Sequence, residues 1–300
     1  MEDPNPASSL MSGLPEGRIV RTFSRMKALQ VEARNIMKWF EDHDDGNQWI
    51  VVLGLRPNII EKLDNHSLGE VNYRFQWEQT TGLIKVVPSG PHEGATHQFS
   101  TLVTSKLIAM GIPSHECPWF GSTTYRPDVG KGKEGDNIFV PRSRCLPTFG
   151  WPTLVIETGV SESLPRLRQD AAKWFADSNG ETRFVILISV RKRKLYYEKW
   201  QLAPPNARRP LTRANIRSLC AQAPNTPPLA PQRPPLQQPY CASEVEVTST
   251  GVAGQPNLVV GAPMVLPFAA LYNRSPAANE TDVVLSQNDF ADMTDLLLRL

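Results

Sequence analysis

The chain reads GDNIFVP at residues 135–141, WPTLVIETGVSES at 151–163 and LRQDAAKWF at 167–175. The first two segments each hold a short apolar run bounded by Pro and Gly, which is the pattern of a buried strand. The third has its apolar residues at helical spacing. A nearly all-apolar run follows at 183–190, as in a central strand covered on both faces. We therefore expect an α/β fold with a mixed central sheet flanked by helices.

Two carboxylates lie at the ends of these expected strands. Asp136 opens the first apolar run, and Glu157 closes the second. Hard divalent cations such as Mg²⁺ prefer oxygen ligands and commonly use one or two carboxylates together with waters and substrate phosphates. The pair is therefore a candidate for half of a phosphodiester-cleaving site. Acidic residues are also common at strand ends without any metal, and spacing alone leaves that alternative open.

The order Asp136, Glu157, Asp170 and Lys173 resembles the pattern of the PD-(D/E)XK nuclease superfamily, in particular the small proteins called putative restriction endonuclease domain proteins. In that pattern an Asp precedes a strand that ends in Glu, and a helix carrying Asp and Lys follows. The resemblance covers roughly residues 71–200. It implies a restriction-endonuclease-like core and a metal-dependent endonuclease that hydrolyses phosphodiester bonds in DNA.

The same resemblance implies a metal site. Asp136, Glu157 and the backbone carbonyl of Thr158 would bind Mg²⁺ or Mn²⁺, which lowers the pKa of a bound water and stabilises charge on the phosphate. The lysine of the superfamily belongs two residues after the Glu, where this chain has Gly159.

A cation from the following helix is the expected substitute for that lysine. Lys173 is the first candidate, with Asp170 orienting it, and Arg168 is the reserve. Because glycine offers no charge at position 159, a second hypothesis stands beside the nuclease. In it the domain is catalytically silent and acts as a nucleic-acid-binding or protein-interaction module.

Three further residues match the entrance to the site in the resembling family. An alternating segment at 71–77 and an apolar one at 83–87 predict a β-hairpin, and residues 95–110 predict a helix. His92, Glu93 and His97 lie at the start of that helix. Glu93 would contact a metal-bound water and a histidine would hold a phosphate. Capping of the helix and bonds to the backbone are the alternative for each histidine.

The dipeptide Pro127-Asp128 spells part of the superfamily motif but precedes a glycine-containing stretch rather than a strand. Residues 130–135 (GKGKEG) predict a flexible loop. Lys131 and Lys133 on this loop would contact a DNA backbone or form a solvated loop tip. The basic run at 191–194 predicts a charged hairpin turn, with a localisation signal or a phosphate contact as the alternative.

Bulk properties narrow the class of protein. The net charge of the 300 residues is only +2, so any nucleic-acid contact must be a local basic surface. The four cysteines lack CxxC spacing, which argues against a zinc knuckle and indicates a reducing compartment. No secretory signal and no apolar stretch long enough for a membrane are visible. We expect an intracellular protein, nuclear or cytoplasmic, with DNA as partner and a homodimer left open.

Composition and pattern divide the chain into five expected regions. They are a disordered N-terminus at 1–17, a helical extension at 18–66, the nuclease-like core at 67–202, a Pro/Arg-rich disordered insertion at 203–243 and a strand-helix segment at 244–300 that docks on the core. Residues 203–240 hold ten prolines, five arginines and no acidic residue. Such a segment buries little apolar area, so we expect a mobile linker, with loose binding of nucleic acid or of an aromatic groove as alternatives.

Overall fold

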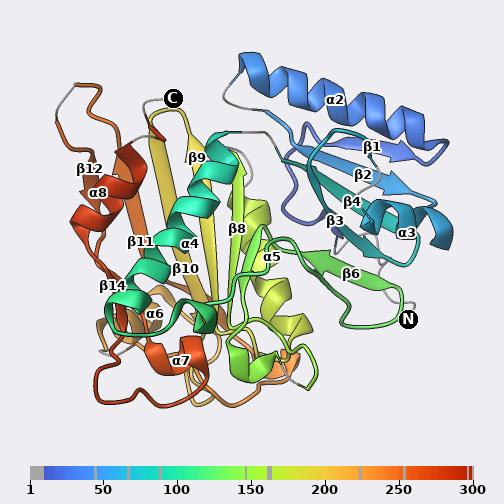
Figure 1. Ribbon diagram of the computed structural model, residues 1–300. Coiled ribbons are helices and arrows are strands. Elements are labelled where there is room, and N and C mark those ends of the chain that lie inside the picture. The colour runs from blue at the N-terminus through green and yellow to red at the C-terminus, as the bar shows by residue number, and fades with distance from the viewer. Residues whose placement is uncertain are drawn as a thin grey trace.

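The computed structural model describes residues 10–43, 46–65, 68–87, 90–145, 147–160, 164–222, 225–252, 255–295 and 297–298. Within them the chain forms two six-stranded sheets and a small two-stranded one, with helices against both large sheets (Figure 1). The predicted mixed α/β class is confirmed. The specific restriction-endonuclease core remains a prediction.

We call one of the two six-stranded sheets the core sheet. Its strand order is β12 (Leu258–Val260), β11 (Pro239–Thr248), β10 (Lys194–Leu202), β9 (Phe184–Arg191), β8 (Leu154–Val160) and β7 (Asn137–Phe139). Strands β8 and β9 pair in parallel, and the other neighbours are antiparallel. This is the mixed sheet that the apolar runs predict. The charged run at 191–194 forms the β9–β10 hairpin turn, as expected.

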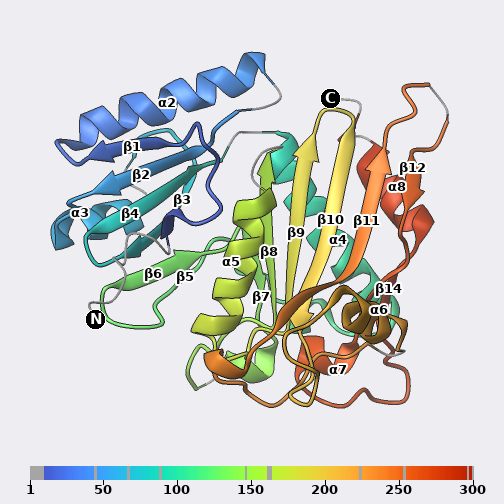
Figure 2. The same ribbon diagram turned by 180° about the vertical axis from the view of Figure 1, so that it is seen from behind.

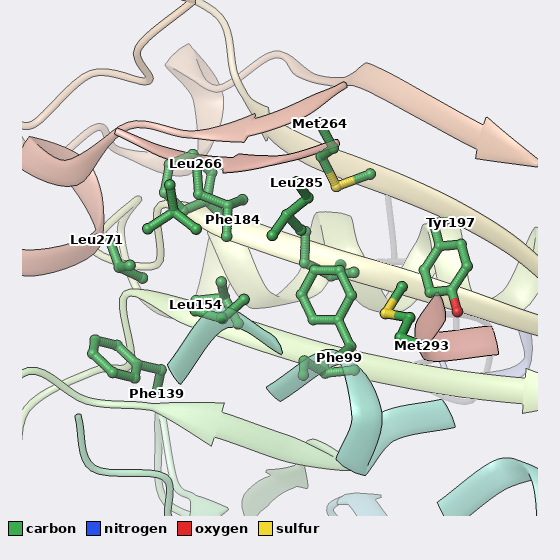
Figure 3. Packing of buried hydrophobic residues seen from close by; sticks show 14 of the residues in the cluster. Phe99, Phe139, Leu154, Phe184, Tyr197, Met264, Leu266, Leu271, Leu285 and Met293 are labelled. Atoms are coloured by element: carbon green, nitrogen blue, oxygen red, sulfur yellow. The ribbon is translucent and has the colours of Figure 1, made fainter. Parts of the chain in front are cut away.

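Helices cover both faces of the core sheet. α4 (Pro91–Ala109) and α8 (Gln287–Asp295) lie on one face, and α5 (Leu164–Asp177) lies on the other (Figures 1 and 2). The β13 (Met264–Leu266) and β14 (Val283–Leu285) pair and α7 (Phe268–Tyr272) close the α4 side. Side chains such as Phe99, Phe184 and Leu285 interdigitate there (Figure 3).

The period of two along β8 sends alternate side chains to the two faces. Leu154 and Ile156 join the cluster under α4, whereas Val155 joins the cluster under α5. Glu157 therefore lies on the α5 face, in the middle of a strand that continues to Val160 rather than at its end.

The N-terminal sheet corrects the prediction of a helical extension at 18–66. Its order is β1 (Ile19–Thr22), β2 (Trp49–Leu53), β4 (Thr81–Val86), β3 (Tyr73–Glu78), β6 (Lys131–Glu134) and β5 (Thr124–Tyr125). In the described part of that region, only α2 (Met26–Asp42) and α3 (Pro57–Asp64) are helical. Residues 19–22 extend because they pair in parallel with β2, a long-range contact that helical spacing does not report.

Strand β3 has two different faces. Tyr73, Phe75 and Trp77 pack into the apolar cluster that also contains residues of α2 and α3. Arg74, Gln76 and Glu78 face the opposite way by alternation and are largely buried. They meet the core sheet and α5 rather than water. The polar face of the predicted half-buried strand is therefore an interface between two layers.

The expected loop at 130–135 is also wrong, since residues 131–134 form β6. Trp77 is the cross-strand partner of Gly132, and a Cβ on Gly132 would lie 2.1 Å from the Trp77 ring. The indole occupies the space above this glycine, so the glycine marks close packing in a strand instead of a turn.

The Pro/Arg-rich segment carries structure where we expected a mobile linker. It contains α6 (Arg213–Ala221) and a 3₁₀ turn at Pro234–Leu236, and β11 begins at Pro239. The buried Arg183 explains the order: its guanidinium donates to the carbonyls of Pro228 and Leu229 at 3.1 and 2.6 Å. These bonds hold a chain that has little apolar side-chain area of its own.

The two ends of the chain differ from expectation in part. Within the expected disordered N-terminus, residues 1–9 lie outside the described residues, but Leu10 is buried against Trp49 and Val51. The strand-helix segment expected at 244–300 contains α8 (Gln287–Asp295), and residues 296, 299 and 300 lie outside the described residues. No helix in the described ranges is long and apolar enough to cross a membrane.

Candidate functional site

A buried cluster of charged side chains lies between the two sheets. The N-terminal sheet contributes cations, and the core layer contributes mainly acids. We call it the inter-sheet cluster; its members are Arg74, Lys85, Lys133, Asp136, Glu157, Arg166 and Asp170. It contains the two acids that the sequence singles out.

Asp136 and Glu157 come together on one face of the core sheet. β7 and β8 pair with Asn137 opposite Ile156, so the residues just before and just after them are neighbours. Lys85 of β4 reaches this pair from the N-terminal sheet. Its Nζ lies 2.6 Å from Asp136 Oδ2 and 3.6 Å from Glu157 Oε2. Two carboxylates thus share one cation, and that cation is a lysine side chain.

Besides Lys85, two groups lie close to the Asp136 carboxylate. The Thr158 backbone N–H donates to Oδ2 at 2.7 Å, and the Arg74 guanidinium forms an ion pair with Oδ1 at 3.1 Å. Burial alone would raise the pKa of Asp136, but Lys85, His92 and Arg74 outweigh it and hold the pKa well below its usual range. The carboxylate is therefore ionised. Its Oδ2 accepts from Lys85 and the Thr158 N–H, whereas Oδ1 accepts no hydrogen bond and has only the ion pair with Arg74.

His92 binds the neighbouring backbone. Its Nε2 lies 2.7 Å from the Thr158 carbonyl oxygen and 3.7 Å from Asp136 Oδ2. Burial lowers the pKa of His92 to about 4, so the ring is neutral at pH 7 and Nε2–H donates to the carbonyl. His92 takes the backbone-bonding alternative, and it occupies the carbonyl that the resemblance assigns to a metal.

The two other residues expected at the entrance lie further out. The Glu93 carboxylate is about half exposed and pairs with Arg74 at 3.6 Å. The exposed His97 ring is near the Thr101 hydroxyl at 3.5 Å and does not reach the cluster. Glu93 is thus at the edge of the inter-sheet cluster and His97 is outside it.

Glu157 is held from the α5 side. The Trp174 indole N–H donates to its Oε1 at 2.7 Å, and Lys133 Nζ lies 3.6 Å from the same oxygen. Burial raises the pKa of Glu157, and Lys133 and Lys85 oppose that rise. Neighbouring cations therefore compensate the charge of the Glu157 carboxylate less well than that of Asp136.

Asp170 orients a different lysine from the expected one. Lys133 Nζ donates to its Oδ1 at 2.6 Å, and the Arg166 guanidinium donates to both oxygens at 3.0 and 3.2 Å. Burial favours a higher pKa, but Arg166 and Lys133 lower the pKa of Asp170 to about 2. Lys133 also lies 5.3 Å from the centre of the Trp174 ring.

The structure does not bring Lys173 or Arg168 to the acid pair. Lys173 Nζ binds Glu78 at 2.5 Å and lies 3.7 Å from Asp177, and Arg168 binds Glu198. The cations beside the acids are Lys85 and Lys133, which sequence reasoning missed. The available signal for Lys85 is a single lysine in the otherwise apolar run LIKVV at 83–87.

The residues present do not fit a divalent metal in this arrangement. The expected ligands, which are Asp136, Glu157 and the Thr158 carbonyl, are engaged by Lys85, Arg74, Trp174, His92 and a backbone N–H. A space of about 10 Å³, roughly what one water molecule needs, lies beside Glu157 and is lined also by Arg74, Lys85, Lys133 and Asp170, but not by Asp136. Among the described residues no group of three His, Cys, Asp or Glu side chains is placed to hold a metal ion.

The similarity of this chain to known proteins is one of structure and not of sequence. No protein-family model matches the chain, and no curated protein matches its sequence. The chain is similar to a solved structure from Anabaena variabilis described as a putative nuclease belonging to DUF820. The identity is 15% and the TM-score is 0.33, over 46% of this chain and 81% of that chain. At this TM-score neither the restriction-endonuclease core nor the activity is established, and the PD-(D/E)XK resemblance stays a prediction.

Proposed function

We propose that this protein is a nuclease-like domain that binds nucleic acid and does not hydrolyse it at the inter-sheet cluster. The observation that carries the absence of hydrolysis is the position of Lys85 between Asp136 and Glu157. A lysine at this point offsets one unit of the negative charge of the two acids, where a divalent cation would offset two. The lysine does not lower the pKa of a water molecule or bind a phosphate oxygen as a Lewis acid, which metal-assisted hydrolysis requires.

Burial supports the same conclusion. The side chains of Asp136, Glu157 and Lys85 are 1%, 4% and 4% exposed. A phosphodiester must approach an acid pair within bonding distance of a shared ion, and the space beside Glu157 in the cluster is only about 10 Å³. Buried charges that are paired in this way hold the two layers together. Removing one partner of such a pair strongly destabilises the fold.

A metal-dependent endonuclease is the second candidate function. Its support is the meeting of two acids and two lysines, since Lys85 and Lys133 both lie within 3.6 Å of Glu157. Lys85 would then stand in for the lysine that Gly159 cannot provide. This function requires Lys85 to leave its present position so that Mg²⁺ or Mn²⁺ can reach the acids.

A nuclease assay with isosteric variants separates the two functions. Purified parent protein, Asp136→Asn and Glu157→Gln are incubated with plasmid and with single-stranded DNA, with Mg²⁺, with Mn²⁺ and with EDTA. Thermal melting of each variant confirms that it is folded. We expect equal, background cleavage in all three proteins and binding of labelled DNA by all three. Metal-dependent cleavage by the parent that both folded variants lack would establish the endonuclease instead.

A further inference from the structure

The Pro/Arg-rich segment presents cations that the rest of the molecule does not use. Residues 203–239 contain five arginines, no lysine and no acidic residue. We call four of these residues the arginine surface; they are Arg208, Arg213, Arg217 and Arg233, and all are exposed. The fifth, Arg209, donates to the carbonyls of Pro235 and Leu236 and fixes the backbone.

The arginine surface consists of two pairs of residues, one on α6 and one on two stretches of chain that run side by side. Arg213 and Arg217 are one turn apart on α6, so their side chains are neighbours on that helix. α6 packs on β11 (Figure 2), and the stretch around Arg208 runs beside the stretch around Arg233. The Gln238 amide, for example, donates to the Arg208 carbonyl at 3.3 Å.

The four guanidinium groups make no ion pair or side-chain hydrogen bond with any described residue. One acid on the strand beneath α6 lies near this helix. Glu244 is close enough to Cys220 of α6 to contribute to its raised pKa, which burial mainly causes. Like charges at positions i and i+4 of a helix repel, so Arg213 and Arg217 destabilise α6 unless an anion neutralises them.

We propose that the arginine surface binds the phosphate backbone of a nucleic acid. The guanidinium group is planar and always charged, and its fork of donors matches phosphate oxygens in pairs. Several such groups spread over one surface suit a polymer with regularly repeated phosphates. This inference rests on the proposed function for the class of ligand, but it places the contact on the segment 203–239 and away from the inter-sheet cluster.

The salt dependence of binding provides a quantitative expectation. Each phosphate neutralised on a single strand contributes about −0.7 to the slope of log affinity against log salt. If all four arginines contact phosphates, the slope is roughly −3. Removing two of them should make the slope less steep by about 1.4 and weaken binding about tenfold or more at low salt.

Fluorescence anisotropy with a labelled oligothymidine of about 20 nucleotides, longer than common single-strand site sizes, tests the proposal. The test variant is Arg213→Gln with Arg217→Gln, and a second variant carries Arg208→Gln with Arg233→Gln. The matched control is Arg191→Gln with Arg193→Gln, which removes the same charge from the β9–β10 turn. We expect both test variants to bind more weakly with shallower salt slopes, and the control to bind like the parent.

Three results would overturn the proposal: no binding by the parent at low salt, equal weakening in the control, or displacement of the DNA by polyglutamate as effectively as by unlabelled DNA. The last result would assign the surface to an acidic protein partner. Cleavage is measured in the same samples with Mg²⁺. Metal-dependent cleavage would refute the proposed function without affecting the arginine surface, whereas unchanged binding in the test variants would refute the surface alone.

Discussion

Replacement of Lys85 by Met removes the shared cation of the inter-sheet cluster and keeps most of the side-chain volume. Asp136 retains Arg74 and the Thr158 N–H, and Glu157 retains Trp174 and Lys133. Removing one partner of a buried ion pair costs about 3–5 kcal/mol. Since about 1 kcal/mol shifts the melting temperature of a chain somewhat smaller than this one by roughly 2–4 °C, we expect a fall on the order of 10 °C.

The same variant should acquire affinity for a divalent cation, because the two acids are then left without their common partner. A ligand that binds only the folded state at about 100 times its Kd stabilises it by about 2.7 kcal/mol. Differential scanning fluorimetry with and without Mn²⁺ measures both effects. We expect Mn²⁺ to raise the melting temperature of Lys85→Met by several degrees, roughly 5–10 °C, and to leave the parent unchanged.

Lys194→Met is the matched control for this experiment. Lys194 pairs with Glu246 at 2.7 Å, but its side chain is 46% exposed, and such surface pairs contribute about 0–1 kcal/mol. The melting temperature of the control should be close to that of the parent and should not change with Mn²⁺. The reasoning is refuted if Mn²⁺ stabilises the parent as much as the variant, or if Lys85→Met costs no more than the control.

Three other outcomes follow from buried charges. The pKa of Asp170 is lowered to about 2, so its ion pairs stabilise the fold above its unfolded pKa of about 3.8; urea titrations should show that stability falling between about pH 4 and pH 2, and less so in Asp170→Asn. Burial lowers the pKa of Lys199 to about 8, so its charge destabilises the fold below pH 8 and this cost fades toward pH 10.5. The shift from 10.5 corresponds to about 3 kcal/mol, and the lost bond to the Val265 carbonyl offsets about half of it or more, so Lys199→Met should gain about 1 kcal/mol, and at most about 2, in urea unfolding at pH 7 and nothing at pH 10.5. Arg183→Met should free the carbonyls of Pro228 and Leu229, and limited proteolysis should then cut within residues 225–236 faster than in the parent; equal rates would show that other contacts order the segment.

The meeting of Asp136 and Glu157 was accessible from the sequence for a simple reason. Each residue is tied to a short apolar run, and strands close in sequence usually pair in a sheet. The pairing of β7 and β8 then brings the two acids together without any knowledge of the rest of the chain. The buried strand β9 and the helix α5 follow from equally local patterns.

The cations of the cluster were not accessible in the same way. Lys85 reaches the acids because β3 and β4 turn their polar face toward the core sheet, an arrangement that depends on how two layers pack. The strand that carries Lys133 was not predicted, because the neighbouring Gly132 suggests a loop when it is considered alone. Only its partner Trp77, more than 50 residues earlier, shows that the glycine belongs to a strand.

Composition misled in the Pro/Arg-rich segment for a related reason. Its own side chains bury little apolar area, and that is all that composition measures. The bonds that hold it come from Arg183 at the start of β9, which offers donors to the backbone carbonyls of the segment. The sequence around a buried arginine does not indicate which backbone carbonyls its guanidinium will bind.

The position of Lys85 is tested most directly by a crystal structure of the parent protein grown with Mn²⁺, using anomalous scattering to locate the metal. We predict Lys85 Nζ within hydrogen-bonding distance of the Asp136 carboxylate and no anomalous peak between Asp136 and Glu157. A manganese ion bound by both carboxylates, with Lys85 displaced, would contradict the account and establish a metal site.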